Sequence, residues 1–205
     1  ERSVQVKKVI PLILILCFAF SSCSLPQKNT QPVVQKNEYR KAVWIAYYEL
    51  SEFTKGKSEY EFEQKLNDEF SKLSSYGFNT VTAQIRPCAD AFYLSEYFPS
   101  SVYFNGTQGG EMLYDPLKIM CYVAQKYKLN IEAWINPYRV SQDDDYTKLS
   151  HDNFAIKNKK ITKVVDGKIY FNPAYDKVTD LIVNGVKEIV ENYNISAIHF
   201  DDYFY

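Results

Sequence analysis

Residues 79–86 read NTVTAQIR and residues 130–136 read NIEAWIN, with apolar side chains at every second position. This alternation is typical of β-strands, because successive side chains of a strand point to opposite faces. An amphipathic stretch between them opens with Asp115 and Pro116, an N-cap residue followed by proline at the first helical position. A strand, a helix and a second strand in this order predict a βαβ unit with a parallel sheet.

The same pattern continues on both sides of this unit. We expect further strands at Lys41–Tyr48 and Ile195–Asp201, and helices at Glu59–Tyr76 and about Asp176–Tyr193. This order predicts an α/β fold that forms about the first half, strands one to four, of a TIM-type (β/α)₈ barrel. A doubly wound open sheet is the alternative, because periodicity does not separate the two. No glycine-rich phosphate loop follows the first strand, where a dinucleotide-binding sheet needs one.

The loops after the second and third strands are long, covering residues 87–114 and 137–174. The second loop contains Ile161–Phe171, in which two short β runs flank Asp166 and Gly167, and this predicts a hairpin. Long structured loops are usually functional, and in a barrel they surround the carboxyl ends of the strands. We therefore expect a site at that end.

One face of each predicted strand carries polar or aromatic residues. A purely structural barrel fills its interior with branched apolar side chains, and polar groups there cost free energy unless they pair or meet a ligand. The sequence therefore predicts a cavity for a polar ligand. The candidate ligand-binding residues are Trp44, Gln84, Arg86, Asp90, Trp134, Asn136, Tyr138, Arg139, His199 and Tyr203.

Each candidate also has a purely structural interpretation. The arginine, aspartate and asparagine side chains suit hydrogen bonding to hydroxyl or acetamido groups, but an ion-pair network that orders the loops uses the same residue types. The two tryptophans suit stacking on sugar rings, or packing alone.

Asp201 is the strongest candidate for chemistry. A carboxylate at the inward tip of the fourth strand can act as a nucleophile or stabilise an oxocarbenium-like transition state. The alternative is a carboxylate that pairs with Arg86 or Arg139 and orders the rim. Asp202 is a second catalytic candidate of opposite parity, and its alternative is a cap or a partner for an arginine at the rim. Glycosidases use two carboxylates across the scissile bond, so we expect the second carboxylate to lie outside this chain.

Composition argues against other partners. The net charge of −1 gives no basic footprint for nucleic acid. The two histidines, His151 and His199, lack metal-ligand spacing, so we expect no metal and no other cofactor. A metal-dependent hydrolase that uses His199 and Asp201 is a weaker hypothesis. Cys88 and Cys121 are expected to be buried free thiols.

The first residues have the pattern of an export signal. A lysine pair precedes the apolar run Val9–Phe20, which is too short to span a bilayer, and two serines then precede Cys23. This ending is similar to a bacterial lipobox, so we expect a lipoprotein signal peptide at residues 1–23 with lipidation at Cys23. An ordinary signal peptide is the alternative.

The rest of the chain is then organised in two parts. Residues 24–39 are polar and aperiodic, as in a flexible tether, and residues 40–205 form the half barrel. The expected location is the outer face of the bacterial cell membrane or the envelope.

Four stretches carry a family resemblance, in the order Phe78–Glu96, Tyr114–Leu117, Ile131–Val140 and Ile195–Tyr205. Together they resemble the bacterial glycosyl-hydrolase-like family ten, over about residues 41–205. The resemblance implies a barrel on an envelope lipoprotein that cleaves a cell-envelope glycan, with peptidoglycan strands as the leading substrate.

The resemblance further implies that Asp201 is the nucleophile and that strands five to eight lie outside this chain. We therefore expect the 205-residue chain to be inactive alone. A non-catalytic glycan-binding lipoprotein on the same scaffold is the alternative. Ser100 departs from the family, which usually has tryptophan there.

Overall fold

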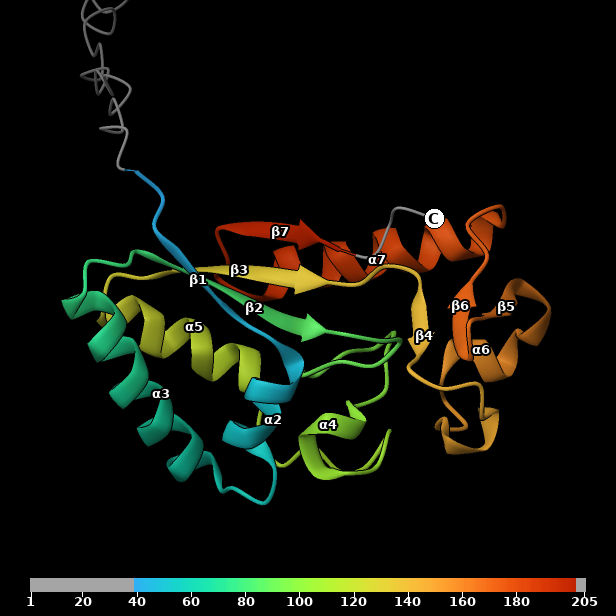
Figure 1. Ribbon diagram of the computed structural model, residues 1–205, viewed down its shortest axis with the longest axis horizontal. Helices are drawn as coiled ribbons and strands as arrows, with labels where there is room; N and C mark the ends of the chain where they lie inside the picture. Colours follow the sequence, from blue (N-terminus) through green and yellow to red (C-terminus); the bar gives the residue numbers. More distant parts are fainter. Residues whose placement is uncertain (1–38, 202–205) are drawn as a thin grey trace, which may run out of the picture. The chain divides into compact units, whose positions relative to one another are not determined.

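The computed structural model describes residues 39–201 (Figure 1). Its main sheet is fully parallel and has the strand order β1-β2-β3-β7. The strands are β1 (Ala42–Ile45), β2 (Thr80–Arg86), β3 (Asn130–Ile135) and β7 (Ala197–Phe200). Helix α3 (Glu59–Ser75) precedes β2, α5 (Pro116–Lys126) precedes β3 and α7 (Asp176–Asn192) precedes β7. The predicted α/β order is confirmed, and a sequentially ordered parallel sheet is consistent with part of a barrel.

The starts of α3 and α5 follow from local sequence. The Ser58 hydroxyl accepts a hydrogen bond from the backbone N–H of Glu61 at 3.3 Å, and the Glu61 carboxylate accepts one from the backbone N–H of Ser58 at 2.9 Å. This capping box satisfies two amide groups that the helix itself leaves unpaired. Asp115 caps α5 by accepting from the backbone N–H of Lys118 at 3.0 Å, directly before Pro116.

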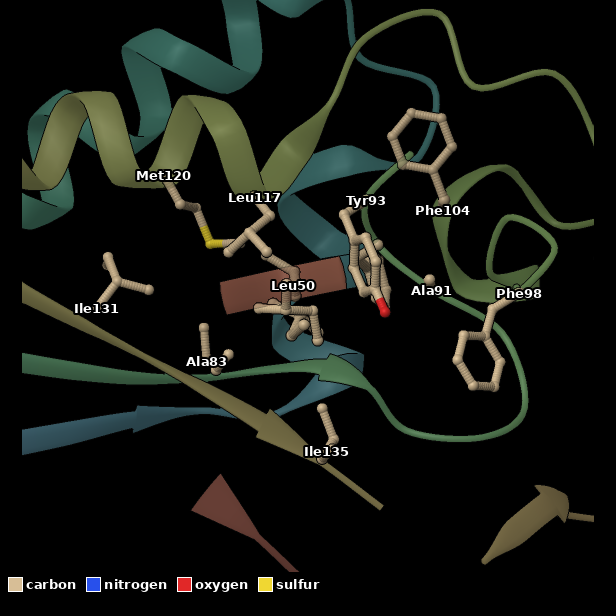
Figure 2. Packing of buried hydrophobic residues seen from close by; sticks show 14 of the residues in the cluster. Leu50, Ala83, Ala91, Tyr93, Phe98, Phe104, Leu117, Met120, Ile131 and Ile135 are labelled. Atoms are coloured by element: carbon tan, nitrogen blue, oxygen red, sulfur yellow. The ribbon is translucent and has the colours of Figure 1, made fainter. Parts of the chain in front are cut away.

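One face of the main sheet, the outer face, is apolar and sealed by helices. It comprises Val81, Ala83, Ile85, Ile131, Ala133 and Ile135, all of which are at most 2% exposed. Figure 2 shows Leu117 and Met120 of α5 pointing toward Ala83 and Ile131. Burial of each large aliphatic side chain contributes about 1.5–3 kcal/mol. The predicted alternation of apolar and polar faces is confirmed in β2 and β3 up to Gln84 and Ile135.

The first strand is shorter than predicted. It ends at Ile45, and helix α2 (Tyr47–Thr54) begins where the sequence suggested more strand. The Glu49 carboxylate accepts the backbone N–H of Ala46 at 2.8 Å, and Leu50 is fully buried. This cap and the buried leucine outweigh the strand propensity of the adjacent tyrosines.

The loop after β3 forms a second, antiparallel sheet, hereafter the small sheet, with the order β4-β6-β5. Its strands are β4 (Arg139–Ser141), β5 (Thr162–Val165) and β6 (Lys168–Phe171). Asp166 (φ 47°) and Gly167 (φ 70°) are both left-handed, as a tight hairpin turn requires, so the predicted hairpin is confirmed. Figure 1 shows the small sheet beyond the carboxyl ends of β2 and β3.

The remaining elements are short and lie in the two long loops. They are α4 (Val102–Asn105), η1 (Tyr146–Lys148), α6 (Phe154–Lys157) and η2 (Lys159–Ile161). Cys88 and Cys121 are buried free thiols, as predicted, and burial raises the pKa of Cys121 to about 11.

Several predictions fall on residues that the structure does not describe. These are the signal peptide, lipidation at Cys23, most of the tether, and the roles of Asp202 and Tyr203. Among the helices of residues 39–201, none has the length and apolar character needed to cross a membrane.

Candidate functional site at the strand ends

The face of the main sheet opposite the outer face, the inner face, carries three rings that contact one another. The Trp44 ring centroid lies 4.8 Å from that of Trp134 and 4.7 Å from that of His199, both edge-on. In the strand register Trp134 pairs with His199. Trp44 is 48% exposed and Trp134 only 8%. This ring cluster therefore has a packed side and a side open to a ligand.

Two amides lie beside the ring cluster and tie three strand ends together. The Gln84 amide donates to the Asn136 side-chain oxygen at 2.6 Å, and the Gln84 oxygen accepts the backbone N–H of Tyr47 at 3.2 Å. Both side chains are almost fully buried. The Asn136 amide nitrogen has no hydrogen-bond partner among the described residues. A buried donor of this kind needs a partner, which a bound ligand or water can supply.

An ion pair lies in the register row of Trp44, two residues nearer the amino end of β3 than Trp134. The Arg40 guanidinium donates to both carboxylate oxygens of Glu132, at 2.7 Å for Nε, and the Thr82 hydroxyl donates to the same carboxylate at 2.8 Å. Arg40, more than Thr82, lowers the pKa of Glu132. Glu132 is therefore held ionised on the inner face. Strand alternation is enough to place Glu132 on the inner face, but it gives no sign of the pairing with Arg40.

Asp201 lies at the carboxyl end of β7. Its backbone N–H donates to the carbonyl of Ile135 at 3.1 Å, which extends the pairing of β7 with β3 by one residue. Strand alternation places the Asp201 side chain on the same face as His199. The structure therefore brings six predicted residues to one end of the inner face, namely Trp44, Gln84, Trp134, Asn136, His199 and Asp201.

The prediction that Arg86 faces the interior is wrong. A bulge shifts the register between Gln84 and Arg86, so Arg86 pairs with the outer-face residue Ile135. Its guanidinium lies 4.3 Å from the Phe98 ring centroid, and a Cβ built on Gly185 of α7 would come within 2.8 Å of it. Burial lowers the pKa of Arg86. The bulge has therefore moved this cation into the layer between the sheet and α7.

Asp90 is also away from the inner face, in the loop after β2. It is fully buried, and one carboxylate oxygen accepts from the backbone N–H of Val102 at 3.2 Å and the amide of Gln108 at 3.1 Å. Burial raises the pKa of Asp90 to about 6. These contacts fit the loop-ordering alternative.

Tyr138 and Arg139 belong with the small sheet. Arg139 opens β4 and pairs in register with Tyr170, and the carbonyl of Tyr138 accepts the backbone N–H of Phe171 at 2.8 Å. Both side chains are half-buried. They therefore lie at the edge of the strand-end site that the small sheet forms, outside the ring cluster.

Tyr47 is a rim residue that the sequence analysis missed. Its ring centroid lies 4.4 Å from that of Tyr103, and its hydroxyl accepts from the Gln142 amide at 3.5 Å. The available signal was the tyrosine pair at the end of the first strand.

Within residues 39–201, no three histidine, cysteine or acidic side chains gather as metal ligands.

The sequence of this part of the chain matches the model of a known protein family. The model described as Glycosyl hydrolase-like 10 matches residues 39–205. The chain belongs to the glycosyl hydrolase-like 10 family. Among curated relatives, Glycosyl hydrolase YngK of Bacillus subtilis is 40% identical over 177 residues, and Glycosyl hydrolase DigH of Escherichia coli K12 is 30% identical over 152 residues. These alignments cover 83% and 70% of this chain. The chain spans about a third of the length of either relative (34% and 35%).

Solved structures agree on the fold of this family member. A maltogenic α-amylase from Thermotoga neapolitana aligns with a TM-score of 0.52 at 12% identity, covering 79% of this chain and 39% of the enzyme. A γ-cyclodextrin glucanotransferase (CGTase) from alkalophilic Bacillus clarkii aligns with a TM-score of 0.52 at 11% identity, covering 80% and 31%. At such identity the likeness establishes the fold alone.

Proposed function

We propose that this glycosyl hydrolase-like 10 chain supplies strands one to four of a barrel that hydrolyses a cell-envelope glycan. Peptidoglycan glycan strands are the leading substrate. The proposal includes export of the protein and a lipid anchor at Cys23, which together would hold the barrel beside that glycan. Family membership supports the glycosidase assignment, whereas the substrate and the location are inferred from the sequence.

The inner face is the observation that carries the proposal. Three rings, two buried amides and one acidic tip occupy the positions that a structural barrel fills with aliphatic residues. The open side of Trp44 suits the apolar face of a pyranose ring. The unpaired Asn136 amide suits a hydroxyl or acetamido oxygen.

Asp201 takes the role of nucleophile or stabiliser of positive charge at the anomeric carbon in this proposal. The reaction also needs a carboxylic acid to protonate the leaving oxygen. Glu132 does not suit that role, because its ion pair with Arg40 favours the ionised form. We therefore expect the acid to come from another strand, about 5–5.5 Å from Asp201 for retention or about 6.5–9.5 Å for inversion.

Asp202 and Tyr203 take subsidiary roles. Asp202, of opposite parity, is proposed as a rim carboxylate that assists Asp201, and Tyr203 as a contact for sugar. A loss of turnover in Asp202→Asn as large as that in Asp201→Asn would assign the nucleophile to Asp202 instead.

The test uses the protein at its full natural length and purified peptidoglycan glycan strands. Asp201→Asn should lower turnover at least about a thousandfold while the strands still bind, because charge stabilisation is lost but the contact surface is kept. Asp180→Asn, an exposed position on α7, is the matched control and should keep full activity. Wild-type turnover by Asp201→Asn would contradict the catalytic role. Strand binding without turnover by the wild type would indicate a non-catalytic glycan binder.

A further inference from the structure

The small sheet has one buried face and one open face. Val140, Ile169 and Phe171 point into the core and are at most 2% exposed. Side chains of the opposite parity form the open face, which we define as Arg139, Lys163, Val165, Lys168 and Tyr170. Three of these five residues are basic, although the chain as a whole has a net charge of −1.

The register brings cations and an aromatic ring into one row across all three strands. Tyr170 of β6 pairs with Arg139 of β4 on one side and with Lys163 of β5 on the other. Lys168 pairs with Val165 in the next row of the open face. Tyr170 therefore lies between cations, an arrangement that suits a flat ligand with a negative charge.

A hollow of about 370 Å³ lies on the same side of the hairpin. Tyr138, Tyr170, Lys163, Val165 and Asn172 are among its lining residues. A hollow of this size and mixed character can hold a sugar ring, with aromatic side chains against its apolar face and an amide for its hydroxyls.

The two lysines of the open face are available to bind an anion. Lys163 is exposed and Lys168 half-buried. Neither makes an ion pair or a side-chain hydrogen bond with another residue of the described part of the chain. Asp166, at the hairpin turn, is a carboxylate that lines the hollow. Lys163 lines the hollow, and Lys168 lies in the next row of the open face, outside the lining. The two ammonium groups and the single Asp166 carboxylate leave this part of the open face with a positive balance.

The hollow is linked to the candidate active site through the chain at Tyr138. Tyr138, which lines it, comes two residues after Asn136 of the strand-end site, and its carbonyl accepts from Phe171 of the hairpin at 2.8 Å. Figure 1 shows β4, β5 and β6 beyond the carboxyl end of β3. A chain of sugars that leaves the ring cluster in this direction would reach the open face next.

We propose that the open face of the small sheet is a subsite for a sugar that bears a carboxylate. The ring lies on Tyr138 and Tyr170, and the carboxylate pairs with Lys163 and Lys168. This inference rests on the proposed glycan-hydrolase function and deepens it, because it makes the substrate an acidic glycan read over several sugars. Neutral glycans of the same length bind the ring cluster but gain nothing from the two lysines.

The experiment compares two tetrasaccharides by titration calorimetry, using the full-length protein with Asp201→Asn to prevent cleavage. One alternates N-acetylglucosamine with N-acetylmuramic acid and so carries lactyl carboxylates, and the other is neutral chitotetraose. Lys163→Ala/Lys168→Ala should weaken binding of the acidic sugar about tenfold and leave the neutral one unchanged. Lys163→Arg/Lys168→Arg should restore most of the affinity. Lys177→Ala/Lys187→Ala on α7 removes the same charge at exposed positions and should change neither affinity.

The outcomes separate this inference from the proposed function. Equal weakening of both sugars, or no weakening of either, would overturn the lysine subsite while the glycosidase proposal stands. Failure of the protein to bind either sugar, together with no turnover of glycan strands, would overturn both. Loss of binding to phosphatidylglycerol vesicles with unchanged sugar affinity would assign the open face to a membrane surface instead.

Discussion

The two faces of the main sheet are built from the same strands but have different composition. On the outer face, Ile131 and Ile135 alternate with small alanines and are sealed against α5. On the inner face, Trp44 is half-exposed and Asn136 keeps a buried donor without a partner in the described part of the chain. The outer face stabilises the fold, and we propose that the inner face is kept for a ligand. Mutations on the two faces should therefore affect different measurements.

The largest effect on stability is expected on the outer face. Ile131→Ala should lower the free energy of unfolding by about 3 kcal/mol, because it leaves a cavity where the side chain is 2% exposed. Urea denaturation measures this directly. Trp44→Ala, on the opposite face, serves as the comparison and should lower the free energy of unfolding by less, since Trp44 is already nearly half exposed. A larger loss in Trp44→Ala would break the contrast between the faces.

A second effect concerns the buried carboxylate of Asp90, which lies on neither face. Its pKa of about 6, raised by burial from 3.8, means that the folded state holds the proton more tightly than the unfolded state. Stability should therefore fall as the pH rises from about 4 to about 6, by about 3 kcal/mol in total. Asp90→Asn mimics the protonated acid and should remove this dependence, so its advantage over wild type appears above pH 6 and vanishes below pH 4.

Thermal unfolding of both proteins across that range provides the measurement for Asp90. Parallel curves at all pH values would show that the carboxylate titrates normally in the folded protein. Glycan affinity should be unchanged by the substitution, because Asp90 lies away from the inner face, in the loop after β2.

A smaller effect is expected from the paired charge on the inner face. Glu132→Gln should lower the free energy of unfolding by about 1–2 kcal/mol near neutral pH, because Arg40 and Thr82 lose a charged acceptor. The folded pKa of Glu132 is lowered, so the stabilisation is present above the ordinary value of 4.5 and disappears as the pH falls through the lowered one. Wild type and variant should converge in acid. Arg40→Gln should give a similar pH profile, and a variant difference that persists in acid would assign the effect to packing.

The last and smallest expected effect is on binding affinity. Trp44→Ala should weaken binding of chitotetraose about tenfold, equal to about 1.4 kcal/mol, through loss of one stacking surface. Arg86→Met should leave that affinity unchanged, because the bulge places Arg86 on the side of α7. A loss of affinity in Arg86→Met as large as in Trp44→Ala would show that Arg86 belongs to the glycan-binding face after all.

Local sequence signals predicted much of the fold. The Ser58–Glu61 capping box fixed the start of α3, and Asp166-Gly167 fixed the hairpin, because each depends on atoms within a few residues. Period-two alternation placed six site residues on one face. These features need no knowledge of distant packing.

The predictions failed where distant contacts decide. The bulge before Arg86 appears in the pairing of β2 with β3, and the displaced guanidinium contacts the Phe98 ring. Neither partner is visible in the sequence of β2 itself. One failure was local: the cap of α2 by Glu49, three residues after Ala46, outweighed a run that looked like strand. The Arg40–Glu132 pair joins residues 92 positions apart, so the alternation that located Glu132 gave no information on its partner.

The central claim is that the inner face of the main sheet binds glycan with Asp201 beside the reacting sugar. A crystal structure of the full-length Asp201→Asn protein with the acidic tetrasaccharide tests it most directly. The account predicts one sugar against Trp44, hydrogen-bonded to the Asn136 amide, with its anomeric carbon facing residue 201 and the next carboxylate near Lys163. Sugar bound only on the outer side, against α7 or the loop after β2, with an empty ring cluster, would contradict it.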